Sequence, residues 1–115
     1  MKSKFSKYID GVLKICKQNE QKTDFAAVQN ITSTNNLDVI SKMAFGEMSK
    51  RVQDIEFAES QGHSLSMKVR VPLVDFISNS NVVLIGNTLY DIYKLDISRE
   101  KQEIYLYLEE ARKIE

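Results

Sequence analysis

The chain has 115 residues, room for one domain with one modest core, and its 43% hydrophobic and 28% charged content argues against wholesale disorder. Its 16 basic and 16 acidic residues give a formal net charge of zero, which argues against a protein that mainly neutralises phosphates. The single cysteine excludes an intrachain disulfide, and no apolar run reaches the roughly 18 residues of a membrane span, so we expect a soluble, cytoplasmic, single-domain protein.

The N-terminal third combines a basic start, an ambiguous element and a polar segment. Residues 1–22 hold six lysines against two acidic residues. Residues 8–17, YIDGVLKICK, fit either an alternating strand or a helix with an apolar face, and both interpretations remain open. Residues 19–36 are polar and end in a cluster of Ser, Thr and Asn, so we expect an extended loop there.

A strand followed by a short helix is expected next. The apolar content predicts a strand around Met43 to Val52, with Gly46 as a bulge or close-approach site. The following segment predicts a short helix with Asp54 as its N-cap and Gly62 as its left-handed C-terminal stop. The helix residues expected to face inward are Ile55, Phe57 and Ala58.

The segment LSMKVRVPL has the clearest alternation in the chain, which predicts a strand with one buried and one solvated face. The residues expected on the buried face are Leu65, Met67, Val69 and Val71. Those expected on the solvated face are Ser66, Lys68 and Arg70. Pro72 lacks an amide donor, so it should end the strand or lie at an edge.

The last third predicts a hairpin and a final strand. Val82 to Ile85 is a continuous apolar run typical of a strand buried on both faces, and Gly86-Asn87 is a two-residue turn signal. The returning strand should place Leu89, Tyr93 and Leu95 on one face and Tyr90, Ile92 and Lys94 on the other. After a charged turn at 98–102, a strand is expected over 103–110, with Ile104, Leu106 and Leu108 opposed to Tyr105 and Tyr107, and then a polar tail from Ala111. Together these elements predict a mainly β fold: a small antiparallel β-barrel with one short helix and a long N-terminal loop.

The sequence offers little for catalysis, and we expect no catalytic residues, no cofactor and no metal. His63 stands alone in an expected loop, and one Cys and one His cannot make a closed zinc site. Cys16 is best explained as a small buried hydrophobe. The tyrosines Tyr90, Tyr93, Tyr105 and Tyr107 gather in the last two strands, where acidic neighbours favour core or subunit-interface packing over the stacking of nucleic-acid bases.

The order of motifs in the second half of the chain is distinctive. A strand leads into a short helix with Glu56-Phe57, then come Gly62, the alternating strand, the apolar strand with its Gly-containing turn, and a Tyr-x-Ile return at Tyr90 and Ile92. The run from Phe45 to Ile114 resembles the head-closure, or head–tail adaptor, proteins of long-tailed bacteriophages.

That resemblance implies a virion protein of the phage neck, assembled in the host cytoplasm. It implies a hexameric or dodecameric ring between the portal-side adaptor and the tail, which closes the DNA channel and provides the tail-docking surface. The implied partners are other copies of the chain, the portal-side adaptor, a tail-completion or tail-terminator protein, and genomic DNA as a passenger, with no membrane. Two alternatives remain open: a tail-completion or tail-terminator ring protein, and a small barrel that binds single-stranded nucleic acid.

The resemblance also implies that the loop over 19–36 projects toward the channel or a neighbouring ring. The residues expected at such an interface or channel loop are Lys22, Asp24, Phe25, Gln29 and Asn30, together with Tyr105 and Tyr107 from the last strand.

Overall fold

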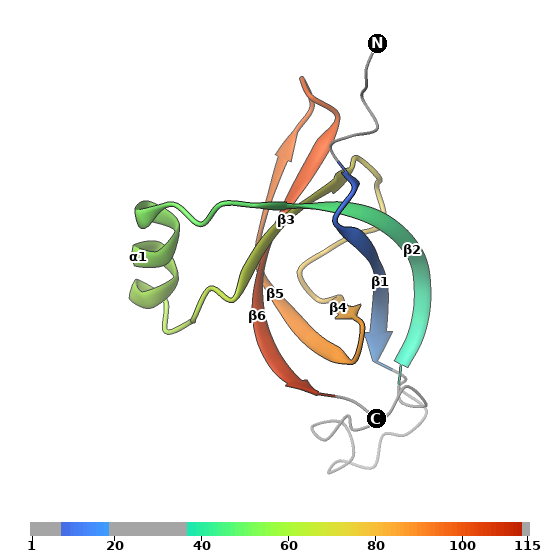
Figure 1. The fold of residues 1–115 in the computed structure, drawn as a ribbon, viewed down its shortest axis with the longest axis horizontal. Helices are drawn as coiled ribbons and strands as arrows, with labels where there is room; N and C mark the ends of the chain where they lie inside the picture. Colours follow the sequence, from blue (N-terminus) through green and yellow to red (C-terminus); the bar gives the residue numbers. More distant parts are fainter. Residues whose placement is uncertain (1–7, 19–36, 114–115) are drawn as a thin grey trace.

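The computed structural model describes residues 8–18 and 37–113, which form a closed antiparallel barrel with one short helix (Figure 1). The strands are β1 (Gly11–Gln18), β2 (Leu37–Met48), β3 (Met67–Pro72), β4 (Val82–Ile85), β5 (Thr88–Ser98) and β6 (Glu103–Lys113), and the helix is α1 (Val52–Ser60). Around the barrel the strand order is β1-β2-β3-β6-β5-β4. The expected fold class is therefore confirmed, whereas the expected loop over 19–36 lies outside the described residues.

The barrel interior holds one apolar core to which every strand contributes. Its buried members are Leu13, Ile15, Met43, Phe45, Val69, Val71, Val83, Tyr90, Ile92, Ile104, Leu106 and Leu108. Full burial of one such aliphatic side chain contributes about 1.5–3 kcal/mol. A second cluster joins Cys16, Leu37, Val82, Leu84 and Leu89. Because Val82 and Leu84 flank the inward-facing Val83, β4 is buried on both faces, as the sequence predicts.

The first two strands settle the ambiguous N-terminal element and correct the boundaries of its neighbour. Residues 11–18 form a strand paired with β2, so the helical alternative is wrong. β2 begins at Leu37 and ends at Met48, and Val52 is instead the first residue of α1. The irregularity in this part of the sheet lies between Ile15 and Cys16, whereas Gly46 pairs regularly with Arg70. The predicted bulge at Gly46 is therefore also wrong.

The hairpin between β4 and β5 has the predicted two-residue turn. Gly86, the first residue of the turn, has φ +60°, whereas Asn87, the second, does not have a positive φ. A positive φ at the first position alone is typical of a type II′ turn. Further along β5, the register with β6 shifts between Ile92 and Lys94. This irregularity changes the phase of the strand, so Tyr90 and Ile92 lie in the core and Leu95 packs against it. The predicted grouping of Leu95 with Tyr93 is therefore wrong.

Strand β6 follows its predicted alternation but is longer than predicted. Ile104, Leu106 and Leu108 are almost completely buried. Arg112 and Lys113 still pair with Leu89 and Thr88 of β5, so the residues from Ala111 continue the strand instead of forming a polar tail.

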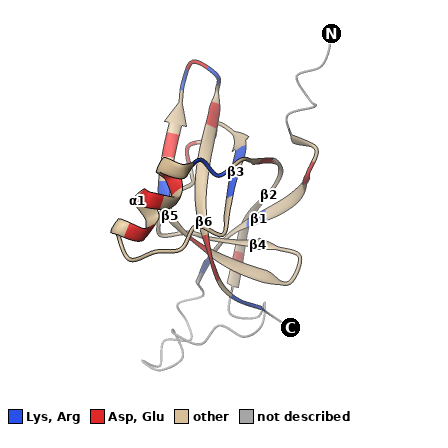
Figure 2. Cartoon of the chain, turned by 60° about the vertical axis from the view of Figure 1, so that its left-hand side comes forward, with Lys and Arg blue, Asp and Glu red and all other residues tan. Residues whose placement is uncertain are grey.

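Helix α1 lies outside the barrel and differs in detail from the prediction. Arg51 is its N-cap, and Asp54 occupies the third helical position, where its carboxylate accepts a hydrogen bond from the Arg51 amide at 3.1 Å. Ala58 is buried as expected, but Ile55 and Phe57 are exposed. The turn after the helix contains Gly62 at φ +80°, which agrees with the predicted left-handed stop. Figure 2 shows the acidic residues along this helix.

The outer face of β3 is not solvated as the alternation suggests. Lys68 is 4% exposed because α1 covers it, and Lys68 Nζ donates to Asp54 at 3.0 Å. Val69 and Val71 face the core as predicted, and Pro72 is the last residue of the strand. Asp54 of α1 lies 14 residues before Lys68 in the sequence. Because α1 packs here, Lys68 on the outer face of β3 is buried and ion-paired instead of solvated.

Candidate functional site

The predicted site residues divide into two groups. Lys22, Asp24, Phe25, Gln29 and Asn30 lie outside the residues that the structure describes. Tyr105 and Tyr107 lie on β6, on the outer face that also carries Lys68 and Asp96. This outer face of β3, β6 and β5 carries the buried charged side chains of Lys68 and Glu103, and we name it the polar face.

At its centre, three charged groups from α1 and β3 meet. The carboxylate of Asp54 accepts a hydrogen bond from Lys68 Nζ at 3.0 Å and two from the Arg51 guanidinium at 3.1 and 3.2 Å. Burial alone would raise the pKa of Asp54, but the hydrogen bonds from Arg51 and Lys68 outweigh it and hold that pKa well below its usual range. Asp54 therefore stays ionised and ties α1 to the barrel.

Tyr107 packs against the ion pair between Lys68 and Asp54. Its side chain is 3% exposed, its hydroxyl donates to Asp96 at 2.9 Å, and the Nζ atoms of Lys68 and Lys94 lie 5.0 and 4.8 Å from its ring centroid. Burial, followed by the hydrogen bond to Asp96, raises the pKa of Tyr107 far above its ordinary value. Lys94 also lies 4.5 Å from the ring centroid of Phe57 and so links β5 to α1.

The far end of the polar face is organised around Glu103, which is 1% exposed. Its two carboxylate oxygens accept hydrogen bonds from Tyr8 at 3.0 Å and from Tyr105 at 2.9 Å. Burial, and then the hydrogen bond to Glu103, raises the pKa of Tyr8 to about 12. Tyr105 is therefore a structural partner of a buried carboxylate, which the sequence pattern did not indicate.

A cavity of about 420 Å³ opens between these two ends. Its lining residues are Met48, Ser49, Arg51, Lys68, Asp96, Tyr105 and Tyr107. Each of the charged groups in this lining already has a partner of opposite charge or a hydrogen-bond partner within the chain. These contacts hold α1 in place.

His63 lies at the edge of the polar face, where the chain leaves α1. Its Nδ1 is 2.7 Å from Glu109 Oε1, and its ring stacks on Tyr93 with 4.7 Å between centroids. The other Glu109 oxygen accepts the amide of Ser64 at 3.1 Å. The only histidine thus fastens the loop after α1 to β6, a role that nothing in the local sequence around it indicates.

Groups suited to metal binding or nucleophilic attack are not gathered in the described chain. Residues 8–18 and 37–113 contain no cluster of three or more His, Cys, Asp or Glu that could hold a metal ion. Burial raises the pKa of Cys16, which makes its thiol less reactive. Residues 8–18 and 37–113 also include no helix long and apolar enough to cross a membrane.

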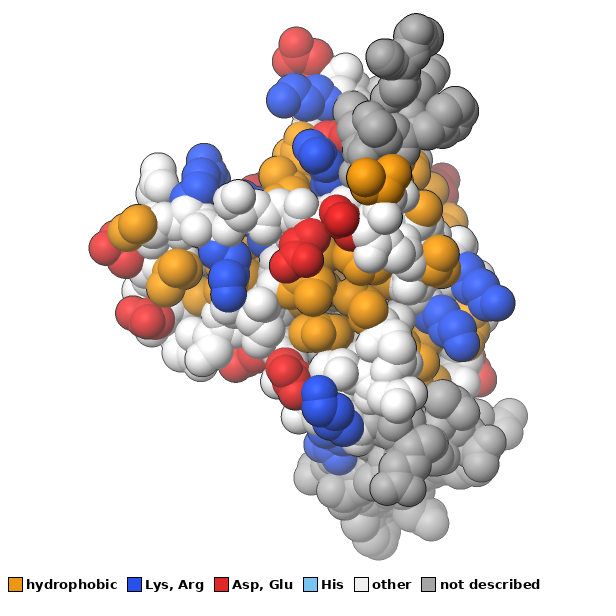
Figure 3. Space-filling view, in the orientation of Figure 1, with side chains coloured by type: hydrophobic (Ala, Val, Ile, Leu, Met, Phe, Trp, Pro, Cys, Tyr) orange, Lys and Arg blue, Asp and Glu red, His pale blue; other side chains and the backbone are white. Residues whose placement is uncertain are grey.

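Two exposed apolar patches lie on different sides of the barrel. The helix patch comprises Val52 and Ile55 of α1 with Glu56 and Glu59, which lie on one face of the helix. The sheet patch comprises Val12, Val39 and Ile40 of β1 and β2 with Lys14 and Lys42. Figure 1 places α1 on one side of the molecule and β1 with the first part of β2 on the other, and Figure 3 shows hydrophobic side chains beside basic ones on the β1–β2 side.

Each patch carries a pair of like charges. Lys14 and Lys42 are directly opposite each other across β1 and β2, and neither forms an ion pair with another described residue. Glu56 and Glu59 are one helical turn apart in α1, whose last turn has no basic residue. Like charges at such positions are unfavourable by a few tenths of a kcal/mol, so each pair would gain from an oppositely charged neighbour.

Comparison with known proteins adds no identification. No protein-family model matches the chain, and no curated protein matches it significantly.

Proposed function

We propose that this chain is a structural protein of the neck of a long-tailed bacteriophage, where its copies form a ring between the portal-side adaptor and the tail. The ring would close the DNA channel after packaging and offer the docking surface for the tail. The order of elements from β2 through α1 to the β4–β5 hairpin and β6 agrees with the order of motifs on which the resemblance to head-closure proteins depends.

The observation that carries this proposal is the complementarity of the two patches. The helix patch is apolar with two glutamates, and the sheet patch is apolar with two lysines. When the helix patch of one copy meets the sheet patch of the next, each like-charge pair faces its opposite and the apolar side chains leave water. Such charge matching fixes register and selects against wrong orientations.

The positions of the patches favour a ring over a two-fold dimer. An interface between two unlike patches is heterologous, and repeating it forms a ring when the rotation between neighbouring copies closes and an open filament when it does not. Because α1 lies on one side of the barrel and β1 with the first part of β2 on the other, a copy can use both patches at once (Figure 1). A two-fold dimer would instead place like charges against each other at either patch.

The two alternatives receive different support. A tail-completion or tail-terminator ring protein would assemble through the same patches and differ only in the component it contacts. A barrel that binds single-stranded nucleic acid needs exposed aromatic rings above a positive groove. Tyr107 and Tyr90 are buried, Tyr93 stacks on His63, and Tyr8 and Tyr105 are hydrogen-bonded to the buried Glu103. These contacts do not fit such a platform.

Electron microscopy of the purified chain with phage portal–adaptor complexes tests the proposal. We expect added ring density at the tail-facing end of the portal complex, at one copy per adaptor subunit or at half that number. Ring density on tail tubes, with none on portal complexes, would favour the tail-terminator alternative. A chain that ignores both and binds oligonucleotides in a salt-dependent manner would overturn the neck assignment.

A further inference from the structure

Strand β5 has a free edge along its second half. Its pairing with β4 runs only from Thr88 to Asp91, whereas its pairing with β6 continues to Ser98. No backbone hydrogen bond from any other described segment reaches the outer edge of residues 93–98. The barrel is therefore closed at one level only, and beyond that level β5 has an edge whose N–H and C=O groups pair with no other described segment.

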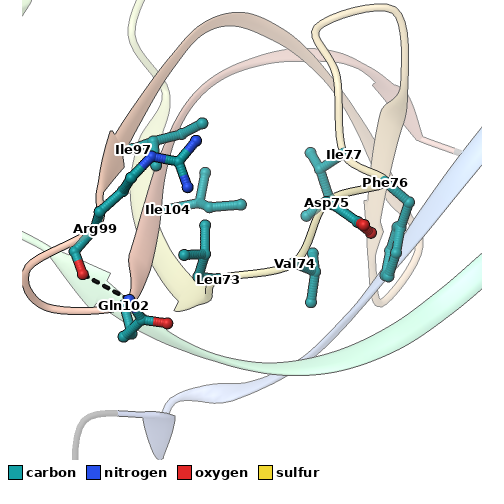
Figure 4. Close-up of a pocket in the computed structure, with 9 residues that line it drawn as sticks. All are labelled: Leu73, Val74, Asp75, Phe76, Ile77, Ile97, Arg99, Gln102 and Ile104. Carbon is teal, nitrogen blue, oxygen red and sulfur yellow. Dashed lines mark hydrogen bonds between the residues drawn. The ribbon is translucent and has the colours of Figure 1, made fainter.

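An apolar groove lies beside this edge. The cavity there has a volume of about 560 Å³ (Figure 4). Ile97 of β5 and Ile104 of β6 form one wall, and the segment from Leu73 to Ile77 forms the other. Ile97 is 52% exposed and Phe76 is 41% exposed, so this groove holds much of the exposed apolar surface that is neither in the helix patch nor in the sheet patch.

Charged side chains mark two sides of the groove. In Figure 4, Arg99 lies on the side of Ile97, and Asp75 lies on the side of Phe76. Both side chains are exposed, and neither forms an ion pair with a described residue. An occupant that spans the groove can therefore place a carboxylate near Arg99 and a cation near Asp75.

These features together define the chemistry of the occupant. Among protein segments and small molecules, an extended backbone matches an unpaired strand edge along its length, since neither a helix nor a small apolar molecule can donate and accept along it. Alternate side chains of an added strand point to the same face, so one set would enter the groove and the other would lie beside Lys94 and Asp96. The occupant is thus extended, with apolar residues at every second position and polar residues between them.

We propose that the free edge of β5 is a docking site for an extended segment of a partner protein, which adds to the barrel as a further strand with its apolar side chains in the groove. The proposal does not depend on ring formation, because residues 93–98 belong to neither the helix patch nor the sheet patch. A failure of one assignment therefore leaves the other standing.

The test uses two seven-residue peptides, acetyl-EVTVTVK-amide and the reversed acetyl-KVTVTVE-amide, which together cover both strand directions. We expect one of them to bind the full chain, to shift the backbone amide resonances of residues 93–98 and to slow their hydrogen exchange. Replacing Ile97→Asp should weaken binding at least tenfold. The matched substitution Val39→Asp, at an equally exposed apolar position of the sheet patch, should leave binding unchanged.

Backbone methylation of the peptide separates strand addition from simple apolar contact. Two versions carry N-methyl groups at alternate residues, in one phase or in the other, with the same side chains. Strand addition predicts that one phase loses at least tenfold in affinity and that the other keeps it, because only one edge of the added strand pairs with β5. Equal affinity of both versions, resonance shifts that spare residues 93–98, or dimers of the chain with no peptide binding would overturn the proposal.

Discussion

Lys68 Nζ lies 3.0 Å from Asp54 Oδ2, and both side chains are 5% exposed, so a complete ion pair is enclosed between β3 and α1. Removing a charge from water is costly unless a partner and further hydrogen bonds compensate it. Here the Arg51 guanidinium supplies those further bonds to Asp54. The position of α1, and with it the helix patch, depends on this contact.

Breaking the pair from the β3 side should destabilise the fold strongly. In Lys68→Met the carboxylate of Asp54 keeps Arg51 but stays buried, and we expect a loss of about 3 kcal/mol in the free energy of unfolding. Urea denaturation of the variant and of the exposed control Lys101→Met measures this loss. A difference below about 1 kcal/mol between the two variants would contradict the enclosed geometry.

The same ion pair predicts a dependence of stability on acid pH. The pKa of Asp54 is lower in the folded chain than its ordinary value near 4, so the ionised form stabilises the fold above that value. This stabilisation should decrease as the pH falls below about 4 and continue to decrease toward the lowered folded pKa. In Asp54→Asn, urea midpoints measured from pH 7 down to pH 2 should lose this part of the slope. An unchanged slope would show that Asp54 is not held ionised.

Asp91 should show the opposite sign. It lies directly opposite Glu109 across β5 and β6. Although its side chain is exposed, partial desolvation by the surrounding strands, together with the charge of Glu109, raises the pKa of Asp91. A raised carboxyl pKa means that the ionised form destabilises the fold at neutral pH. Asp91→Asn should therefore stabilise the chain by a few tenths of a kcal/mol at pH 7, and the gain should vanish below about pH 4. Thermal unfolding of both proteins at the two pH values measures the effect.

Removing single hydroxyl groups should distinguish the two ends of the polar face. Tyr105→Phe takes a hydrogen bond from Glu103, which is 1% exposed, and we expect a loss of about 1.5–3 kcal/mol. Tyr107→Phe takes one from Asp96, whose side chain is 46% exposed and open to water, so about 1 kcal/mol is expected. Denaturant unfolding of the two variants should rank them in this order, and the reverse order would contradict the assigned burial.

Local sequence signals predicted the elements that depend on local chemistry. Alternation identified the core face of β6, Gly86-Asn87 identified the hairpin turn, and Pro72 marked the end of β3. In each of these, the residue types within a few positions determine the backbone, so the pattern is readable without tertiary information.

Features that depend on distant contacts were not predictable in this way. The alternation of β3 predicts Lys68 in solvent, because that pattern carries no information about a helix that packs over the strand. The register shift near Tyr93 inserts one residue relative to β6, and only the pairing of the two strands reveals it. Of the candidate site, the sequence indicates Tyr105 and Tyr107 as interface residues. The burial of the Glu103 carboxylate and the contact of His63 with Glu109 depend on residues far apart in the sequence, so only the structure reveals them.

The claim that copies join through unlike patches is tested most directly by mixing two charge-reversed variants. One carries Glu56→Lys and Glu59→Lys in the helix patch, and the other carries Lys14→Glu and Lys42→Glu in the sheet patch. Glu100→Lys with Lys101→Glu, in the exposed turn between β5 and β6, serves as the control and should associate like the unaltered chain.

Native mass spectrometry of these proteins should show rings for the unaltered chain and monomers for each patch variant alone. Their equimolar mixture should form rings in which the two variants alternate in equal numbers, because the helix patch of each variant matches the sheet patch of the other. Combining all four reversals in one chain should also restore rings. Patch variants that still form rings alone, or an equimolar mixture that forms no mixed ring, would contradict the account.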